Sequence, residues 1–185
     1  MWIYFLIIAG VVILDQITKW IVLLNLPVGE SVDLIPGVFR FTHIKNPGAA
    51  FGILENNRWV FIVISLVAVA AMVAYLVKYR PRDGWLYFPL CMIAGGGLGN
   101  MIDRLFYYEE GGSFGEGLVV DFLDFCAFPN LWHWVFNVAD AFVVVGAGIL
   151  FVYLVLDIIK ESKAEKAKKA AAEDGETEQS KDDAE

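Results

Sequence analysis

The stretch VVDFLDFCAFPNLWHWVFNVAD, residues 119–140, decides how the chain is organised. It carries Asp121 and Asp124 near one end and Asn137 and Asp140 at the other, and long apolar segments lie on both sides of it. A carboxylate at a membrane boundary is costly unless it is hydrated, paired or functional. Two carboxylates that meet at the end of a helix bundle would form an acid/base pair that shares one proton.

The composition is that of a membrane protein. Hydrophobic residues make up 58% of the chain and the mean hydropathy is +0.58, which is too apolar for an ordinary soluble domain. Four segments reach the length of about 20 apolar residues that a bilayer requires. We expect four transmembrane helices, at residues 2–24, 59–77, 85–106 and 134–158. The net charge of −8, without a basic surface, argues against a nucleic-acid partner.

Lysine and arginine predict the orientation of the spans, because cytoplasmic loops are rich in them. Lys78, Arg80 and Arg82 crowd the turn between the second and third spans, and a lysine-rich tail follows the fourth. We expect both termini in the cytoplasm and both long loops outside, although the first loop also holds three basic residues. Residues 1–159 form the membrane domain in this interpretation. Residues 160–185 form a charged cytoplasmic tail, helical and frayed at first and then disordered.

Polar residues inside the spans are grouped. Asp15 and Lys19 lie four apart on one helix face, so they either only neutralise each other or brace a polar cavity; we favour a brace near the site. Asn100, Asp103 and Arg104 share a face at the outer end of the third span. That cluster suits substrate binding, although an arginine there can also snorkel to the surface. The glycines before it indicate close helix packing, since the ending of a phosphate-binding loop is absent.

The first loop predicts a short strand at residues 38–44, with residues 31–34 as its partner. The Asn46 turn that follows, with Gly48, would let a ligand backbone approach closely. We interpret His43 as a residue with a local hydrogen bond rather than a metal ligand. The sequence contains no zinc-binding spacing, and Cys91 and Cys126 are expected to stay unpaired.

Taken without family knowledge, these patterns favour hydrolysis by two carboxylates. One acid would hold a proton and polarise a carbonyl group while the other deprotonates a water molecule. A proton-coupled transporter or channel subunit is the main alternative, because intramembrane acids also relay protons. The second span, however, offers no polar face, and the polar cluster lies at one end. A membrane assembly protein is a third possibility, but it would not explain why the polar residues Asn137 and Asp140 stand at the fourth span.

The sequence resembles the lipoprotein signal peptidases, the bacterial signal peptidase II family, over roughly residues 2–158. Five motifs in the family's order carry the resemblance: DQITK (15–19), NPGAAF (46–51), GGGLGNMIDR (95–104), VVDF (119–122) and FNVAD (136–140). It implies a four-helix membrane aspartic endopeptidase of the bacterial cytoplasmic (inner) membrane, with a small extracytoplasmic sheet and loop that cradle the substrate. Such enzymes remove the signal peptide from prolipoproteins, just before a cysteine that carries diacylglycerol.

Carried over by motif, the resemblance implies that Asp121 and Asp140 are the catalytic pair. It implies that site-lining residues are Asn46, Gly48, Asn100, Arg104 and Asn137, and that supporting residues are Asp15, Lys19 and Asp103. We expect a monomer that is surrounded by membrane lipids and needs no cofactor and no metal. We expect its site to lie near the extracytoplasmic face of the membrane.

Two features depart from the family's usual pattern. Val135 stands where members often have proline, which we expect to affect only the start of the fourth helix. Asp124 is an additional acid three residues after Asp121, and some sharing of its proton or hydrogen-bonding duty stays open at this point.

Overall fold

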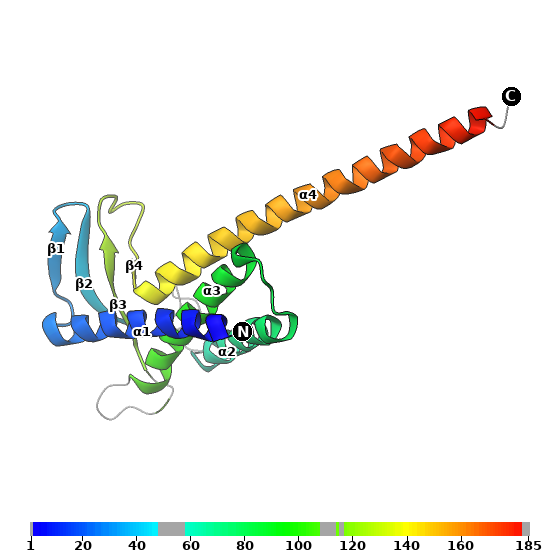
Figure 1. The fold of residues 1–185 in the computed structure, drawn as a ribbon. Coiled ribbons are helices and arrows are strands. Elements are labelled where there is room, and N and C mark those ends of the chain that lie inside the picture. The colour runs from blue at the N-terminus through cyan, green and yellow to red at the C-terminus, as the bar shows by residue number, and fades with distance from the viewer. Residues whose placement is uncertain (1, 48–57, 108–113, 115–116, 183–185) are drawn as a thin grey trace.

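The computed structural model describes residues 2–47, 58–107, 114 and 117–182. The elements in chain order are α1 (Trp2–Asn25), β1 (Ser31–Ile35), β2 (Phe39–Asn46), α2 (Arg58–Tyr79), α3 (Gly84–Phe106), β3 (Val119–Phe125), β4 (Val135–Phe136) and α4 (Val138–Asp182). Figure 1 shows the sheet standing at one end of α1, while α4 runs away from the bundle.

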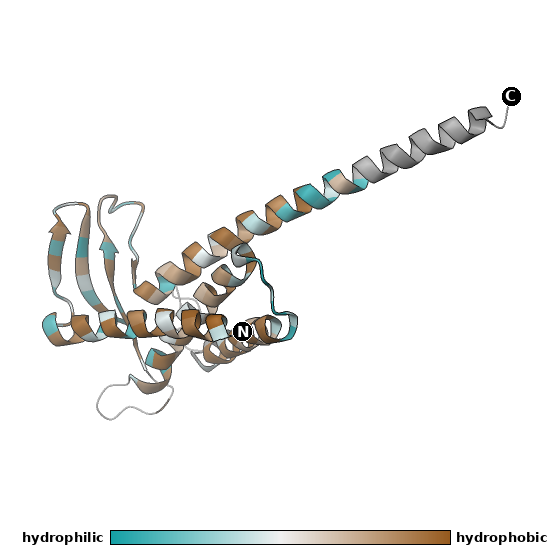
Figure 2. Ribbon diagram, viewed as in Figure 1, coloured by the Kyte–Doolittle hydropathy of each residue, from teal (hydrophilic) through white to brown (hydrophobic). Residues whose placement is uncertain are grey.

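Within the described ranges, four helices are long and apolar enough to cross a membrane. Figure 2 shows hydrophobic residues along α1, α2 and α3 and along the first part of α4. The four predicted spans are therefore confirmed as helices, with small shifts at their ends. Their candidate membrane segments are Trp2–Asn25, Ile62–Tyr79, Gly84–Phe106 and Val138–Glu165.

Helix α3 lies at the centre and contacts α1, α2 and α4. Its glycines make this possible: a Cβ on Gly95 would lie 2.7 Å from Cβ of Val11, and one on Gly96 would collide with the carbonyl oxygen of Ala139. The predicted packing role of the glycine run is thus borne out at these two positions. Close backbone approach is what brings the polar residues of three helices within hydrogen-bonding distance of one another.

The sheet has the order β1-β2-β3-β4, and each neighbouring pair is antiparallel. The first two strands confirm the strand pair predicted in the first loop, but β3 and β4 were not predicted. One face of the sheet packs on the end of α1 through a cluster of Val22, Leu26, Val120 and Phe122. The segment that carries Asp121 is therefore a buried strand and not a loop.

Two details of the sequence prediction are wrong around residue 135. The fourth helix begins at Val138 rather than at residue 134, because Val135 and Phe136 pair with Asp124 and Leu123 of β3. Val135 therefore belongs to strand β4, three residues before the helix begins, and does not determine how the helix starts as we expected. Asp140 consequently lies in the first turn of α4.

Helix α4 continues to Asp182, through the segment after residue 159 that we interpret as a charged tail. The segment after Lys160 is rich in alanine, lysine and glutamate, which are good helix formers.

Candidate active site

Asp121 enters the site from the buried strand β3, where its residue is 1% exposed. Its two oxygens are held by different segments: Oδ2 accepts a hydrogen bond from Nδ2 of Asn46 at 2.8 Å, and Oδ1 accepts one from Nδ2 of Asn137 at 2.6 Å. Asn46 is the last residue of β2, two positions beyond Ile44, the residue that pairs with Asp121. The β2–β3 register therefore delivers both side chains to one place.

Asp140 enters from the first turn of α4 and belongs to a reciprocal cap of that helix. The backbone N–H of Asp140 donates to Oδ1 of Asn137 at 2.9 Å, and Oδ2 of Asp140 accepts from the backbone N–H of Asn137 at 3.2 Å. This is the arrangement of a capping box, with Asn at the cap and Asp three residues later. A carboxylate is also favoured at the positive N-terminal end of a helix. The start of α4 and the position of the acid are thus set together.

Two asparagine side chains join the acids. Nδ2 of Asn137 donates to Asp121 and also to Oδ1 of Asn100, at 2.9 Å. Nδ2 of Asn100 in turn donates to Oδ1 of Asp140 at 2.7 Å. The result is a continuous polar chain from one carboxylate to the other, contributed by β3, α3 and α4.

The electrostatics of Asp121 differ from those of an ordinary aspartate. Burial and, after it, the neighbouring charge of Asp140 raise the pKa of its carboxyl group to about 7, against the lowering effect of the hydrogen bonds from Asn46 and Asn137. A carboxyl group with such a pKa can hold a proton near neutral pH beside a second acid. The pair therefore has the means to donate and accept a proton at the same place.

A second polar layer lies beneath the acids and is centred on Lys19, whose residue is 1% exposed. Its Nζ lies 2.8 Å from Oδ2 of Asp15, 2.8 Å from Oδ2 of Asp103 and 2.9 Å from Oδ1 of Asn100. Oδ1 of Asp15 also accepts a hydrogen bond from the backbone N–H of Ala139, at 2.9 Å. The predicted Asp15–Lys19 pair is present, and it connects α1 to α3 and to the start of α4.

Arg104 is also buried, at the end of α3. Its Nη1 donates to the backbone carbonyl of Asn100 at 3.1 Å, and its charge interacts with Asp140, Asp121 and Asp103. The backbone N–H of Gly117 donates to the carbonyl oxygen of Arg104, at 3.0 Å. This arginine therefore places a positive charge beside the two acids.

A family model described as signal peptidase (SPase) II matches residues 7–156 of this chain. The chain belongs to the signal peptidase II family. Among its relatives, a lipoprotein signal peptidase of Bacillus pumilus is 40% identical over 154 residues, covering 83% of this chain and 93% of that protein. One of Pelotomaculum thermopropionicum is 42% identical over 162 residues, covering 88% and 97%.

Solved structures agree with this assignment. A structure titled as a bacterial membrane enzyme at 2.3 Å resolution has a TM-score of 0.74 and 30% identity, covering 85% of this chain and 90% of that chain. A second one, at 1.9 Å, has a TM-score of 0.70 and 30% identity, covering 83% and 93%. Membership in the signal peptidase II family makes this chain a membrane peptidase, which excludes the transporter and assembly-protein alternatives as its main role.

The structure brings together all but one of the residues that the sequence predicted for the family's site. The exception is Gly48, which lies outside the described residues. Asp124 does not join the two acids: its Oδ2 accepts from Nε of Arg40 at 2.6 Å and from Oγ1 of Thr42 at 2.8 Å. The salt bridge also raises the pKa of Arg40. Asp124 therefore holds β2 and β3 together.

Gln16 is a supporting residue for which the sequence suggested no role. Its Nε2 donates to Oδ1 of Asp103 at 2.8 Å and to the carbonyl oxygen of Gly99 at 3.2 Å. Its position between Asp15 and Lys19 in an apolar helix was the available signal. His43 forms a hydrogen bond rather than a metal contact, but not a local one: its Nδ1 bonds to the carbonyl oxygen of Leu26, 17 positions earlier, at 2.7 Å. Across the described residues, no group of three or more metal-ligand side chains occurs.

Proposed function

We propose that this enzyme cleaves diacylglyceryl-modified prolipoproteins immediately before the lipidated cysteine, with Asp121 and Asp140 as its catalytic pair. The observation that carries the proposal is the polar chain from Asp121 through Asn137 and Asn100 to Asp140. Membership in the family and the name of its relatives, lipoprotein signal peptidase, support the substrate class.

In this mechanism Asp121 begins with the shared proton. Its burial and raised pKa, about 7, support that role, and the protonated carboxyl group would donate to the scissile carbonyl oxygen. Asp140 is less buried and sits at the positive end of α4, so its carboxylate would deprotonate the attacking water. The water oxygen bonds to the carbonyl carbon and a tetrahedral intermediate forms.

The intermediate then breaks down to two products. The bond between the carbonyl carbon and the cysteine nitrogen breaks, and the proton that Asp140 took from water passes to the leaving amine. The carbonyl group re-forms as part of the new carboxyl terminus of the signal peptide, and its hydroxyl proton returns to Asp121. The Arg104 guanidinium, whose charge acts on both acids, would stabilise the negative charge that develops on the carbonyl oxygen while the proton of Asp121 is being transferred to it. No step requires a metal ion or an organic cofactor.

Conservative substitutions test the pair. We expect Asp121→Asn and Asp140→Asn each to abolish cleavage of a diacylglyceryl-modified prolipoprotein in detergent, measured by gel shift, while insertion and folding persist. Asp124→Asn is the matched control on the same strand, and it should retain cleavage because Asp124 faces Arg40 and Thr42. Cleavage close to the wild-type rate by either of the first two variants would remove that acid from the mechanism.

We also propose that both termini lie in the cytoplasm and that the site lies near the extracytoplasmic face of the cytoplasmic membrane. The basic turn before α3 and the lysines after α4 support this orientation. In a Cys126→Ser background, a membrane-impermeant maleimide should label Val32→Cys in protoplasts and Lys163→Cys only after lysis. The reverse pattern would invert the topology.

We further propose that the enzyme acts as a monomer, surrounded by lipid along the exposed apolar faces of α2 and α4.

A further inference from the structure

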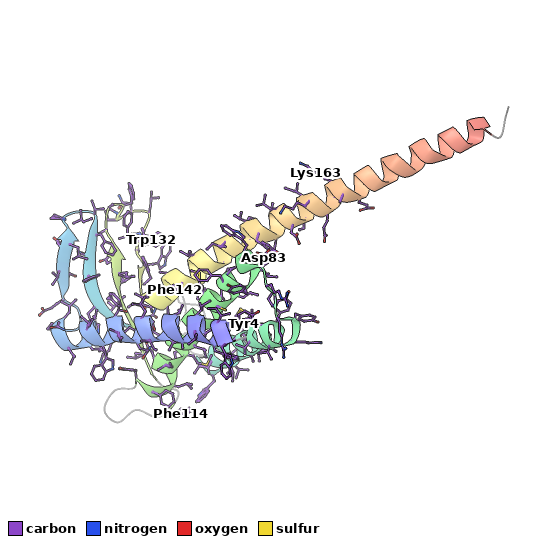
Figure 3. All side chains as sticks on the ribbon, viewed as in Figure 1. Tyr4, Asp83, Phe114, Trp132, Phe142 and Lys163 are labelled. Carbon is purple, nitrogen blue, oxygen red and sulfur yellow. The ribbon has the colours of Figure 1, made fainter. Side chains whose placement is uncertain are left out.

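A cavity of about 510 Å³ lies between the start of α3 and the second half of the apolar part of α4. It is remote from the two acids: Asp157 follows Asp140 by 17 positions in one continuous helix, which corresponds to about 25 Å. Figure 3 shows Asp83 at the beginning of α3, beside α4. The lining residues are Asp83, Trp85, Gly148, Ile149, Val152, Tyr153, Leu156, Asp157 and Lys160.

The cavity has an apolar body and a charged end. Val152 and Leu156 are 55% and 52% exposed, so they present aliphatic surface that the protein itself does not cover. Gly148 leaves the groove open, since a Cβ there would meet nothing within 4 Å. The charges are gathered beyond this surface, on Asp83, Asp157 and Lys160.

The location is that of a membrane interface. Trp85 opens the apolar part of α3 and Lys160 follows the apolar part of α4, and both residue types favour the boundary between acyl chains and water. A groove that is apolar towards the membrane centre and charged at its edge has the polarity of a single phospholipid molecule.

The signs of the charges select among headgroups. Among the residues that line the cavity, two carboxylates stand against one ammonium group, so the lining itself repels a purely anionic headgroup more than it attracts it. A headgroup that carries both a primary ammonium and a phosphate matches all three charges. A quaternary ammonium would match the carboxylates in charge but has no N–H to donate, whereas a primary one has three, as in lysine.

We propose that this cavity binds one phosphatidylethanolamine-type lipid. Its ammonium group donates to Asp83 and Asp157, its phosphate accepts from Lys160, and an acyl chain lies over Gly148 along Val152 and Leu156. Asp83 caps α3 by accepting from the backbone N–H of Trp85 at 2.9 Å, and Tyr153, another residue that lines the cavity, also interacts with it. The site is independent of the catalytic pair.

Native mass spectrometry of the full chain in detergent tests the proposal. The protein is mixed with equal amounts of phosphatidylethanolamine, phosphatidylglycerol and phosphatidylcholine that carry identical acyl chains. We expect one ethanolamine lipid to remain bound in preference to the other two. Asp157→Asn and Asp83→Asn should each weaken that binding by on the order of tenfold, the effect of losing one charge-assisted hydrogen bond. Asparagine also caps helices well, so the second variant keeps the start of α3 intact.

Two further variants separate the groove from the headgroup contacts. Gly148→Phe should fill the groove and remove bound lipid of every headgroup, whereas Gly148→Ala adds only a Cβ into open space and should leave binding unchanged. Asp33→Asn, at an exposed position of β1, is the matched charge control. Folding of each variant is checked by its cleavage activity. Equal retention of the three lipids, a preference for phosphatidylglycerol, or unchanged binding in Asp83→Asn/Asp157→Asn would overturn the proposal.

Discussion

Replacing Lys19 with methionine should destabilise the protein strongly, because Lys19 is the cation between two buried carboxylates. Its Nζ has three partners within 2.9 Å, namely Asp15, Asp103 and Asn100, and three N–H groups to offer them. The side chains of Lys19, Asp15 and Asp103 are at most 2% exposed, so water cannot replace the lost partner. Methionine keeps the length and the apolar contacts of the stem, which isolates the effect of the charge.

The size of the effect can be estimated in two ways. Removing one member of a buried ion pair typically costs about 3–5 kcal/mol of stability. Alternatively, one of the stranded carboxylates can bind a proton. At pH 7 this costs about 4 kcal/mol for a group with an ordinary pKa near 3.9, and it becomes about 1.4 kcal/mol less costly for each unit that the pH is lowered. We therefore expect Lys19→Met to lose about 4 kcal/mol at pH 7 and much less at pH 5.

Unfolding by sodium dodecyl sulfate in mixed micelles, followed by tryptophan fluorescence, measures this free energy. Lys163→Met, at an exposed position in the tail, is the matched control and should be neutral. Adding Asp103→Asn to Lys19→Met removes the surplus negative charge, so the double variant should lose less than the sum of the single losses. A loss below about 1 kcal/mol at pH 7, additive single losses, or a deficit that does not shrink at pH 5 would refute the reasoning.

Three other predictions concern the active site and its packing. Because the pKa of Asp121 is raised to about 7, its contribution to the free energy of unfolding should be present below the unfolded-state pKa of about 3.9 and be lost as the pH rises through about 7. Cleavage should fall as the pH rises through about 7, because Asp121 then loses its proton, and a rate that is flat from pH 6 to 9 would contradict this. Gly99→Ala would put a Cβ 2.5 Å from Oδ2 of Asp15 and should cost about 1–3 kcal/mol and slow cleavage, whereas Gly10→Ala, with nothing within 4 Å, should do neither in the same assays. Chelators should leave cleavage unchanged, and a loss that zinc restores would indicate a metalloenzyme.

The membrane helices were predictable because the length of an apolar run is a physical requirement of the bilayer, but their ends were not. The sequence placed the fourth span from residue 134, since Trp134 and Val135 are apolar enough to begin it. Val135 and Phe136 pair with β3 instead. The decision between strand and helix there depends on a partner strand that local hydrophobicity does not contain.

The strand β3 illustrates the same limit. VVDFLDF does not alternate between apolar and polar residues, because Val119, Val120, Asp121 and Phe122 are all buried. A strand buried on both sides gives no period-two signal. Its second acid, Asp124, was likewise assigned no partner, since Arg40 precedes it by 84 positions and reaches it only through the register of β2 and β3.

The candidate site was more accessible to prediction than the sheet that holds it. Polar residues in apolar spans are conspicuous, and burying them without partners is so costly that they are expected to meet. Which atoms meet could not be deduced in this way. That Asn100 joins Asp140 to Lys19 follows from the depth at which α3 packs on α1 and α4, and hence from the absence of side chains at Gly95 and Gly96.

The cap at Asn137 connects the chemistry to the fold. This one residue orders the first turn of α4, fixes Asp140 through reciprocal hydrogen bonds of its side chain and its backbone N–H, and donates from its side chain to Asp121 on β3. Because the strand before it and the helix after it both depend on the same residue, the spacing of the two acids cannot change without disturbing a strand end or a helix start. The proton sharing that we propose for these two carboxylates needs such a constraint, since small displacements would let water separate their charges. In this enzyme the strand-to-helix junction itself supplies it, which explains why the sequence motif around Asp140 is also the start of a helix.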